Sequence, residues 1–218
     1  MRSILVSSLL LLVASCVTLS ESHEIKGSQP VSGPMPYDFR PADARPTIPA
    51  YVPELTVTNP PYDNVHASWK QRLDQPYVYL EHSGSYTNTG SLIPLLHKEL
   101  MDQGLEASGP PFALYFDDPG RTPVEGLRSR ACVPVAGVRS PRAPLQYDVL
   151  PSTTVVYAVV SGPYPEVPRA YPGMYKYMKK MNWVEDGPIR EIYLISPSAV
   201  ESWDELMTEI QLPATSAR

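Results

Sequence analysis

Between residues 77 and 213, hydrophobic and polar positions alternate in short runs that predict six β-strands. Side chains of a strand point to opposite faces in turn, so alternation over five to eight residues is the pattern of a sheet. The six runs are Tyr77–His82, Phe112–Phe116, Ser129–Val135, Thr153–Val160, Ile189–Ile195 and Thr208–Pro213. The connection 136–150, which contains Pro141 and Pro144, joins the third run to the fourth.

Two other stretches place apolar residues three or four positions apart, which is the spacing of an α-helix. They are Leu92, Leu96 and Leu100 in the first stretch, and Met174, Met178 and Met181 in the second. Pro94 and Pro172 fall in the predicted first turns, where a missing N–H leaves no hydrogen bond unmade. Gly104 and Asn182 are residue types that end helices in the left-handed conformation. Strands and two helices together predict an α+β fold.

The same pattern occurs twice, 78 residues apart. Sliding residues 77–119 by 78 positions pairs eleven identical residues without a gap, and "SGSY" at Ser83–Tyr86 falls on "SGPY" at Ser161–Tyr164. Each copy reads strand, helix, strand, strand, with the first at about residues 77–135 and the second at about 153–213. We therefore predict an internal duplication of a β-α-β-β unit, with antiparallel sheets and the helices on one face.

Alternation also predicts which side chains share a face of the sheet. The helices are expected to cover the apolar positions, which are Val78, Leu80, Leu114, Phe116, Val156, Ala158, Val160, Ile192, Leu194, Ile210 and Leu212. The other face then carries tyrosines and carboxylates, which are Tyr79, Glu81, Tyr115, Tyr157, Glu191, Tyr193 and Glu209, together with Gln211 and Arg130. Tyrosine rings and a partly buried carboxylate suit an aromatic or cationic organic ligand. The alternative is an exposed sheet face without a ligand, since tyrosine is a common strand residue.

The N-terminus has the pattern of an export signal. Arg2 precedes an apolar run from Ile4 to Val13, which is too short for a membrane-spanning helix. The sequence Val13-Ala14-Ser15-Cys16 resembles a bacterial lipobox, which implies cleavage after residue 15 and a lipid on Cys16; the alternative is an ordinary signal cut a few residues later. By the same resemblance, Val17 favours the outer membrane, so we predict an exported lipoprotein on the periplasmic face or the cell surface.

Residues 16–68 are rich in proline and predict an extended tether between the anchor and a domain at 69–215, although residues 52–58 are compatible with an edge strand. Cys132 is the only other cysteine, so no intramolecular disulfide is expected once Cys16 is acylated or removed. The formal net charge of −5 and the absence of a basic cluster argue against nucleic-acid binding.

Three segments together resemble the GyrI-like, or bacterial effector-binding, domain family over about residues 69–214. They are "YVYLEHSGSYTNTGSLIPLLHKELMDQGLEASGPPFALYFDDPG", "RSRACVPV" and "GPIREIYLISP" with "WDELMTEIQLPA". The resemblance implies two β-α-β-β units about a pseudo-twofold axis, with a small-molecule cleft between the halves. In sensors of this family a buried glutamate in an aromatic cage meets lipophilic cations.

On this resemblance Glu209 is the expected central glutamate and Glu191 its rival. Tyr157, Tyr193 and Trp203 are the expected cage residues, and Tyr86 and Tyr164 lie at the rim of the cleft. No helix-turn-helix segment precedes the domain, which argues against a transcriptional role.

Other classes of function are also open. Some members of the family resemble hydrolases of electrophilic small molecules, for which Glu81, Glu191 and Tyr193 are available as acid and base; a non-catalytic interaction module is a further alternative. The duplicated unit is also similar to the SOUL haem-binding family, but the histidines at 23, 66, 82 and 97 show no metal-binding spacing. We therefore expect no cofactor and no metal.

Overall fold

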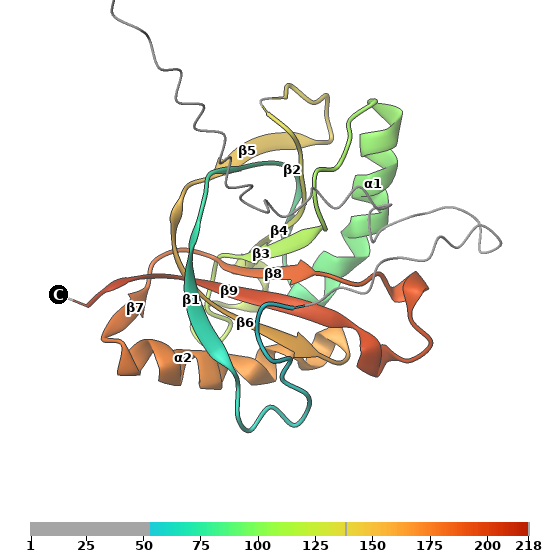
Figure 1. The fold of residues 1–218 in the computed structure, drawn as a ribbon. Coiled ribbons are helices and arrows are strands. Elements are labelled where there is room, and N and C mark those ends of the chain that lie inside the picture. Colours follow the sequence, from blue (N-terminus) through green and yellow to red (C-terminus); the bar gives the residue numbers. More distant parts are fainter. Residues whose placement is uncertain (1–52, 138, 218) are drawn as a thin grey trace, which may run out of the picture. The chain divides into compact units, whose positions relative to one another are not determined.

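The computed structural model of the protein describes residues 53–137 and 139–217 (Figure 1). The predicted signal peptide at 1–15, the proposed lipid-bearing Cys16 and most of the tether lie outside the described residues. Within the described part, every helix is too short or too polar to cross a membrane.

Nine β-strands and two α-helices make up the fold of the described residues. The strands are β1 (Ala67–Arg72), β2 (Gln75–Ser83), β3 (Phe112–Tyr115), β4 (Arg128–Pro134), β5 (Gln146–Leu150), β6 (Thr153–Ser161), β7 (Trp183–Glu185), β8 (Ile189–Tyr193) and β9 (Met207–Ser216). The α-helices are α1 (Ile93–Asp102) and α2 (Tyr171–Lys180). Short 3₁₀ helices are η2 (Tyr86–Leu92), η3 (Val124–Gly126), η4 (Tyr164–Ala170), η5 (Pro197–Ala199) and η6 (Trp203–Glu205).

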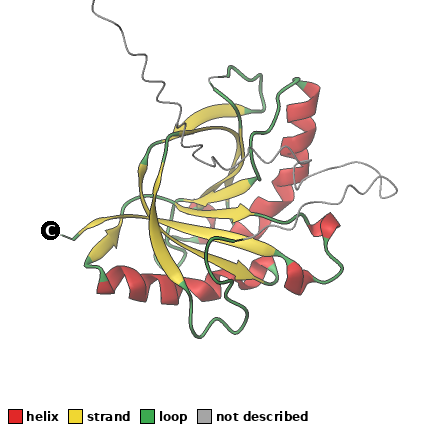
Figure 2. Ribbon diagram, in the orientation of Figure 1, coloured by secondary structure: helices red, strands yellow, loops and turns green. Residues whose placement is uncertain are grey.

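All named strands join one sheet in the order β1-β6-β9-β8-β3-β4-β2-β5, and β7 pairs with β9 (Figure 2). Every pairing between these strands is antiparallel. The predicted α+β class, the six predicted strands and both predicted helices are thus confirmed. The strands β1, β5 and β7 were not predicted. β5 lies in the connection 136–150, which contains two prolines, and β1 overlaps the end of the predicted tether.

The helices cover one face of the sheet, called here the helix face. The side chains of Met174 and Met178 on α2 pack on Val156, Ile210 and their neighbours from β6 and β9. On the other half of the sheet, α1 packs on β2 and β4 through a second buried cluster of Val78, Leu80, Leu96, Leu100, Ala131 and Val133. Both helices therefore bury most of the apolar stripe that the sequence predicted for them. Met181 is the exception, because it follows the last residue of α2 and is 37% exposed.

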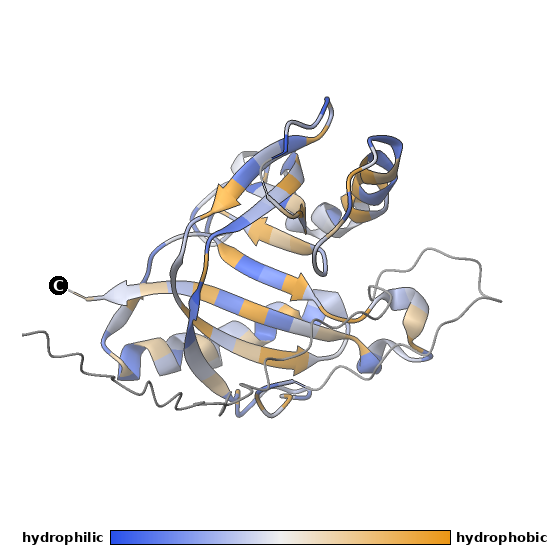
Figure 3. Ribbon diagram, turned by 45° about the horizontal axis from the view of Figure 1, so that its top comes forward, coloured by the Kyte–Doolittle hydropathy of each residue, from blue (hydrophilic) through white to orange (hydrophobic). Residues whose placement is uncertain are grey.

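The opposite face, called here the inner face, is also buried, because the sheet curls around it (Figure 1). Its apolar core contains Tyr77, Tyr79, Phe112, Leu114, Cys132, Leu150, Val159, Ile192 and Leu194. Hydrophobic and hydrophilic residues alternate along β9, whereas β8 carries the two hydrophilic residues Arg190 and Glu191 in succession (Figure 3). An apolar face and a helix-covered face are therefore not the same thing in this fold.

This double burial makes the predicted assignment of faces wrong for β3 and for β8 with the residues that follow it. Across the sheet Tyr79 pairs with Cys132, Cys132 with Phe112, and Phe112 with Ile192, which puts Leu114 and Leu194 on the inner face. Tyr115, Glu191 and Tyr193 consequently lie on the helix face, not beside Tyr79, Tyr157 and Glu209. Alternation predicts which residues of one strand share a face of the sheet. Which residues of different strands share a face is determined only by the register in which the strands pair.

Elements recur at the spacing of 78 residues. β2 and β6 begin at Gln75 and Thr153, and α1 and α2 begin at Ile93 and Tyr171. The turns after β2 and β6 hold Gly84 and Gly162 at φ of 118° and 117°. Such angles strain any side chain with a Cβ, which explains the glycine in both "SGSY" and "SGPY". The duplication itself stays an interpretation of the sequence.

Part of the predicted tether packs against β6 and α2. Thr58 forms an isolated bridge with Val160, and the hydroxyl of buried Tyr62 donates a hydrogen bond of 2.8 Å to the carbonyl of Ser161. Val65 packs on the α2 cluster and leaves no room beside Gly173, where a Cβ would lie 2.6 Å from Val65 Cγ2. Thr58, Tyr62 and Val65 therefore pack on the folded domain, whereas the residues between them are exposed.

We predict that Gly173→Ala destabilises the protein, although alanine favours a helix by about 1 kcal/mol. The added methyl overpacks the contact with Val65, at a cost of about 1–3 kcal/mol. Chemical denaturation of the full chain measures the change, and Gly90→Ala, where a Cβ would meet nothing within 4 Å, is the matched control. Val65→Ala in the same chain should recover part of the loss. Equal stability of the Gly173 and Gly90 variants would show that the segment does not pack on α2.

Candidate ligand-binding site

Glu191 lies at the middle of β8 and points to the helix face. Its neighbours across the sheet are Ala113 on β3 and Ile210 on β9, and only 3% of its surface is exposed. The carboxylate forms no ion pair with any described residue. A carboxylate in such surroundings is costly unless hydrogen bonds or a cation compensate for its lost hydration.

Tyrosine hydroxyls supply those hydrogen bonds. Tyr171, the first residue of α2, donates to Glu191 Oε1 at 2.5 Å, and Tyr115 on β3 lies 3.3 Å from Oε2. The hydroxyl of Tyr115 is also 3.3 Å from that of Tyr193, two residues beyond Glu191 on β8. Burial raises the pKa of all three tyrosines well above their usual range, so they remain protonated donors.

Two further tyrosines flank this group at positions 78 residues apart. The ring of Tyr86 is 4.8 Å from that of Tyr115, and the ring of Tyr164 is 4.7 Å from that of Tyr193. Tyr86 is held by the backbone of Asp117, and Tyr164 donates to the carbonyl of Ile195 at 3.0 Å.

We call these side chains the Tyr–Glu cluster: Glu191, Tyr86, Tyr115, Tyr164, Tyr171 and Tyr193. Glu191 and Tyr193 are buried at its base, whereas the other four tyrosines are partly exposed.

Two opposing effects set the ionisation of Glu191. Burial raises its pKa to about 7, while hydrogen bonds from Tyr171, Tyr115 and Tyr193 favour the charged form and limit the rise. Near neutral pH the side chain is therefore partly protonated. A cation placed beside it would stabilise the carboxylate and expel that proton.

The other predicted site residues on the sheet lie on the inner face. Glu209 pairs with Lys70 at 2.7 Å, and Lys70 Nζ sits 4.0 Å from the ring centroid of Tyr157. The guanidinium of Arg130 lies 4.0 Å from the ring of Tyr79 and 3.8 Å from Glu81. The chain's own cations thus already cover the rings and carboxylates that the sequence analysis assigned to a ligand.

Trp203, predicted as a cage residue, lies on η6 and is 62% exposed, with no ring contact among the described residues. Tyr171, conversely, was not predicted as a site residue. The signal that bears on it is Pro172, which marks the first turn of α2 and so places the preceding residue at the N-terminus of the helix. That this end reaches Glu191 depends on the packing of α2 on the sheet.

Within residues 53–137 and 139–217, no group of His, Cys, Asp or Glu side chains is arranged to hold a metal ion. His82 contacts the carbonyl of Ser85, and His97 contacts that of Ile93. A shallow hollow of about 340 Å³ lies elsewhere, between residues 57 and 66, and is lined by Thr58, Asn59, Asp63 and His66 among others. No predicted site residue lines it.

Comparison with known families identifies the domain. The GyrI-like small-molecule-binding domain matches residues 68–215, which is more than half of the chain. The chain belongs to the GyrI-like family. Membership of this family supports the binding of a small molecule. In this GyrI-like domain, the Tyr–Glu cluster combines a buried carboxyl group with partly exposed aromatic rings. No curated protein matches the chain.

Solved structures share the GyrI-like fold. The crystal structure of the EcmrR C-terminal domain has a TM-score of 0.63 at 22% identity, over 70% of this chain and 99% of that one. EcmrR in a cryo-EM complex with DNA gives a TM-score of 0.62 at 22% identity, and the match spans 70% of this chain but only 58% of EcmrR. SAV2435 bound to tetraphenylphosphonium gives 0.50 at 15% identity, over 69% and 94% of the two chains. At these identities the likeness shows the fold alone.

We predict that Glu191→Gln stabilises the protein at alkaline pH. A carboxyl whose pKa rises from 4.5 to about 7 on folding binds its proton more tightly in the folded state. Its contribution to stability is therefore present below pH 4.5 and is lost as the pH rises through 7, by about 3 kcal/mol in total. Glutamine escapes this loss because it carries no charge.

Denaturation of the full chain between pH 4 and pH 8 tests this expectation. The difference in the free energy of unfolding between the variant and the wild type should grow with pH up to about pH 7 and then level off. Tyr171→Phe removes the donor to Oε1 and should move the midpoint of this change to higher pH. A difference that stays constant with pH would contradict the raised pKa of Glu191.

Proposed function

We propose that the domain captures aromatic organic cations at the Tyr–Glu cluster. The observation that carries this proposal is Glu191, a buried carboxylate surrounded by tyrosine rings and hydroxyls but without a cationic partner among the described residues. A ligand that brings its own positive charge would complete the ion pair, and the rings would bind its apolar surface.

Two features distinguish Glu191 from Glu209 as the ligand's partner. Glu209 already pairs with Lys70 and accepts a hydrogen bond from Gln211 Nε2 at 2.7 Å, so its charge is compensated within the chain. Glu191 lacks such compensation and lies beneath tyrosines that are partly exposed. The proposal therefore prefers Glu191 to Glu209, which the family resemblance favoured. Tetraphenylphosphonium, which SAV2435 binds, is a suitable probe for the same fold.

We predict that the full chain binds tetraphenylphosphonium and that Glu191→Gln weakens this binding by roughly 10- to 100-fold, because the variant removes a desolvated charge partner. Affinity should rise with pH, by up to about tenfold per unit below pH 7, because the cation must displace the proton from Glu191. Isothermal titration calorimetry between pH 5 and pH 8 measures both effects.

Two controls accompany this titration. Glu209→Gln changes a glutamate on the neighbouring strand that faces the other way, and it should leave the affinity unchanged. Triphenylphosphine oxide, a neutral molecule with similar rings, should bind much more weakly than the cation. If Glu209→Gln abolished binding and Glu191→Gln did not, the ligand would lie on the inner face and the proposal would be wrong.

Hydrolysis of an electrophilic small molecule is the second candidate, and the pKa of Glu191 near 7 favours it because a base with such a pKa suits general catalysis. The hydrogen bonds argue for binding instead. Both carboxylate oxygens already accept from tyrosines, which leaves Glu191 less able to take a proton from water. Turnover that disappears in Glu191→Gln would favour the hydrolase.

We also propose that the domain is exported and anchored through a lipid on Cys16, which the lipobox-like sequence supports. Metabolic labelling with an alkyne fatty acid should mark the full chain in a bacterial host. Cys16→Ala should abolish the label because it removes the acceptor sulfur. Cys132→Ala, which changes a buried thiol on β4, should leave it intact. A label that persists in Cys16→Ala would refute the anchor.

A further inference from the structure

Arg190, next to Glu191 on β8, points to the inner face and is almost completely buried, with 3% of its surface exposed. It forms no ion pair with a described residue. Its Nε is buried and has no hydrogen-bond partner, and Nη1 reaches only Gln211 Oε1, at 3.5 Å. A guanidinium carries five N–H donors, so most of the hydrogen-bonding capacity of this charged group is unused.

A second arginine of the inner face, Arg72, also has an unsatisfied Nε. It lies at the end of β1 and donates from Nη2 to the carbonyl of Pro151 at 2.9 Å, but its Nε is buried without a partner. Burial is the main cause that lowers the pKa of Arg190 to about 10; the charge of Arg72 adds to it, and the carboxylate of Glu209 acts in the opposite direction. Glu209 is itself paired with Lys70 and lies outside ion-pair distance of Arg190.

Other cations of the inner face have acidic partners at ion-pair distance, which makes Arg190 unusual. Lys70 is 2.7 Å from Glu209, and Arg130 is 2.8 Å from Asp148. Arg190 is thus a buried cation of the inner face without an ion-pair partner among the described residues. Burial of an arginine without an anion is unfavourable, so an anion that reached this point would gain both the charge interaction and the free donors.

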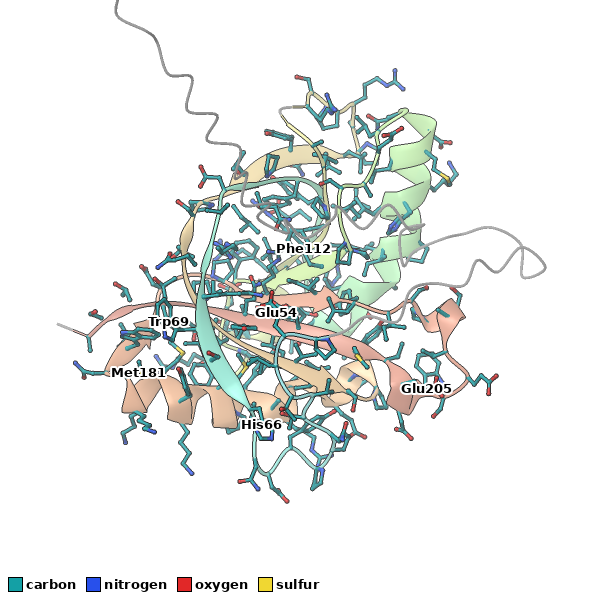
Figure 4. The ribbon with its side chains drawn as sticks, viewed as in Figure 1. Glu54, His66, Trp69, Phe112, Met181 and Glu205 are labelled. Carbon is teal, nitrogen blue, oxygen red and sulfur yellow. The ribbon has the colours of Figure 1, made fainter. Side chains whose placement is uncertain are left out.

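The surroundings indicate what kind of anion fits. The guanidinium of Arg190 lies 3.9 Å from the ring centroid of Phe112, which is labelled in Figure 4, and that ring is 5.5 Å from Tyr77. Phe112 and Tyr77 belong to the apolar core of the inner face, together with Ile192. Charged donors beside aromatic and aliphatic side chains match a molecule with an acidic head and an apolar body.

We propose that the inner face is a second binding site, which takes a small organic acid whose carboxylate accepts hydrogen bonds from Arg190. The planar guanidinium fits a carboxylate through parallel N–H donors. This site is separate from the Tyr–Glu cluster, since Arg190 and Glu191 are successive residues of β8 and point to opposite faces. Residues of one strand, β8, would then bind a cation on one face of the sheet and an anion on the other.

Benzoate is the probe for this site, with the neutral benzamide as its matched control. In calorimetric titrations of the full chain, benzoate should bind and benzamide should bind at least tenfold more weakly. Arg190→Met should abolish the binding of benzoate, whereas Lys176→Met, which removes an exposed cation on α2, should not change it. Glu191→Gln should keep benzoate binding, which separates a failure here from a failure of the cation site.

Thermal unfolding without ligand provides an independent measurement. If Arg190 is a buried charge awaiting an anion, Arg190→Met should raise the melting temperature while it removes the stabilisation by benzoate. A lower melting temperature in Arg190→Met would mean that the arginine serves the fold and would overturn the proposal. Equal stabilisation by benzoate in the variant, or by benzamide in the wild type, would also overturn it. Inorganic phosphate that bound as tightly as benzoate would refute the requirement for an apolar body.

The Nε–H signal of Arg190 in ¹H–¹⁵N spectra reports on the proposed contact directly. It should shift on addition of benzoate and not on addition of benzamide. No shift at saturating benzoate would place the ligand elsewhere, and the proposal would fail even if the chain bound benzoate.

Discussion

The antiparallel pairing of β3 with β8 holds the two halves of this domain together. On one side of that pair lie β9, β6 and β1, and on the other lie β4, β2 and β5. This pairing places Ala113 opposite Glu191, the only carboxylate of β8. Because alanine is small, it leaves room for tyrosine side chains beside Glu191. It also brings Tyr115 and Tyr193 within hydrogen-bond distance, although they lie 78 residues apart. The candidate site is therefore a product of the join between the halves.

The same strand carries two opposite charges into two buried environments. Glu191 is compensated only by neutral tyrosine hydroxyls, and Arg190 only by an aromatic ring and a long contact with Gln211. Both arrangements cost stability, because dipoles and rings replace the hydration of an ion incompletely. The paired groups nearby, such as Lys70 with Glu209, show that the fold accommodates ordinary ion pairs. Uncompensated charges at its centre are consistent with ligands that supply the missing partners.

Much of the local structure followed from the sequence. The glycines of "SGSY" and "SGPY" marked the ends of β2 and β6, and Pro94, Pro172, Gly104 and Asn182 marked the two helices, because these residues act through local backbone geometry. The strands β1, β5 and β7 were not predicted, because short or proline-flanked segments show little alternation of hydrophobic and polar residues. The composition of the cluster was also foreseen, since tyrosine and glutamate stood out on the strands, but Tyr171 was not.

The sequence by itself determined the class of fold, the order of its main elements and the presence of tyrosines and carboxylates on the strands. Local backbone preferences and side-chain alternation carry that information within each segment. Only the tertiary structure decided which side chains share a face, because that depends on the register between strands and on the curl of the sheet. The curl buries both faces, so hydrophobicity no longer separates inside from outside. Glu191 and Glu209 consequently look alike in the sequence and lie on opposite sides of the sheet.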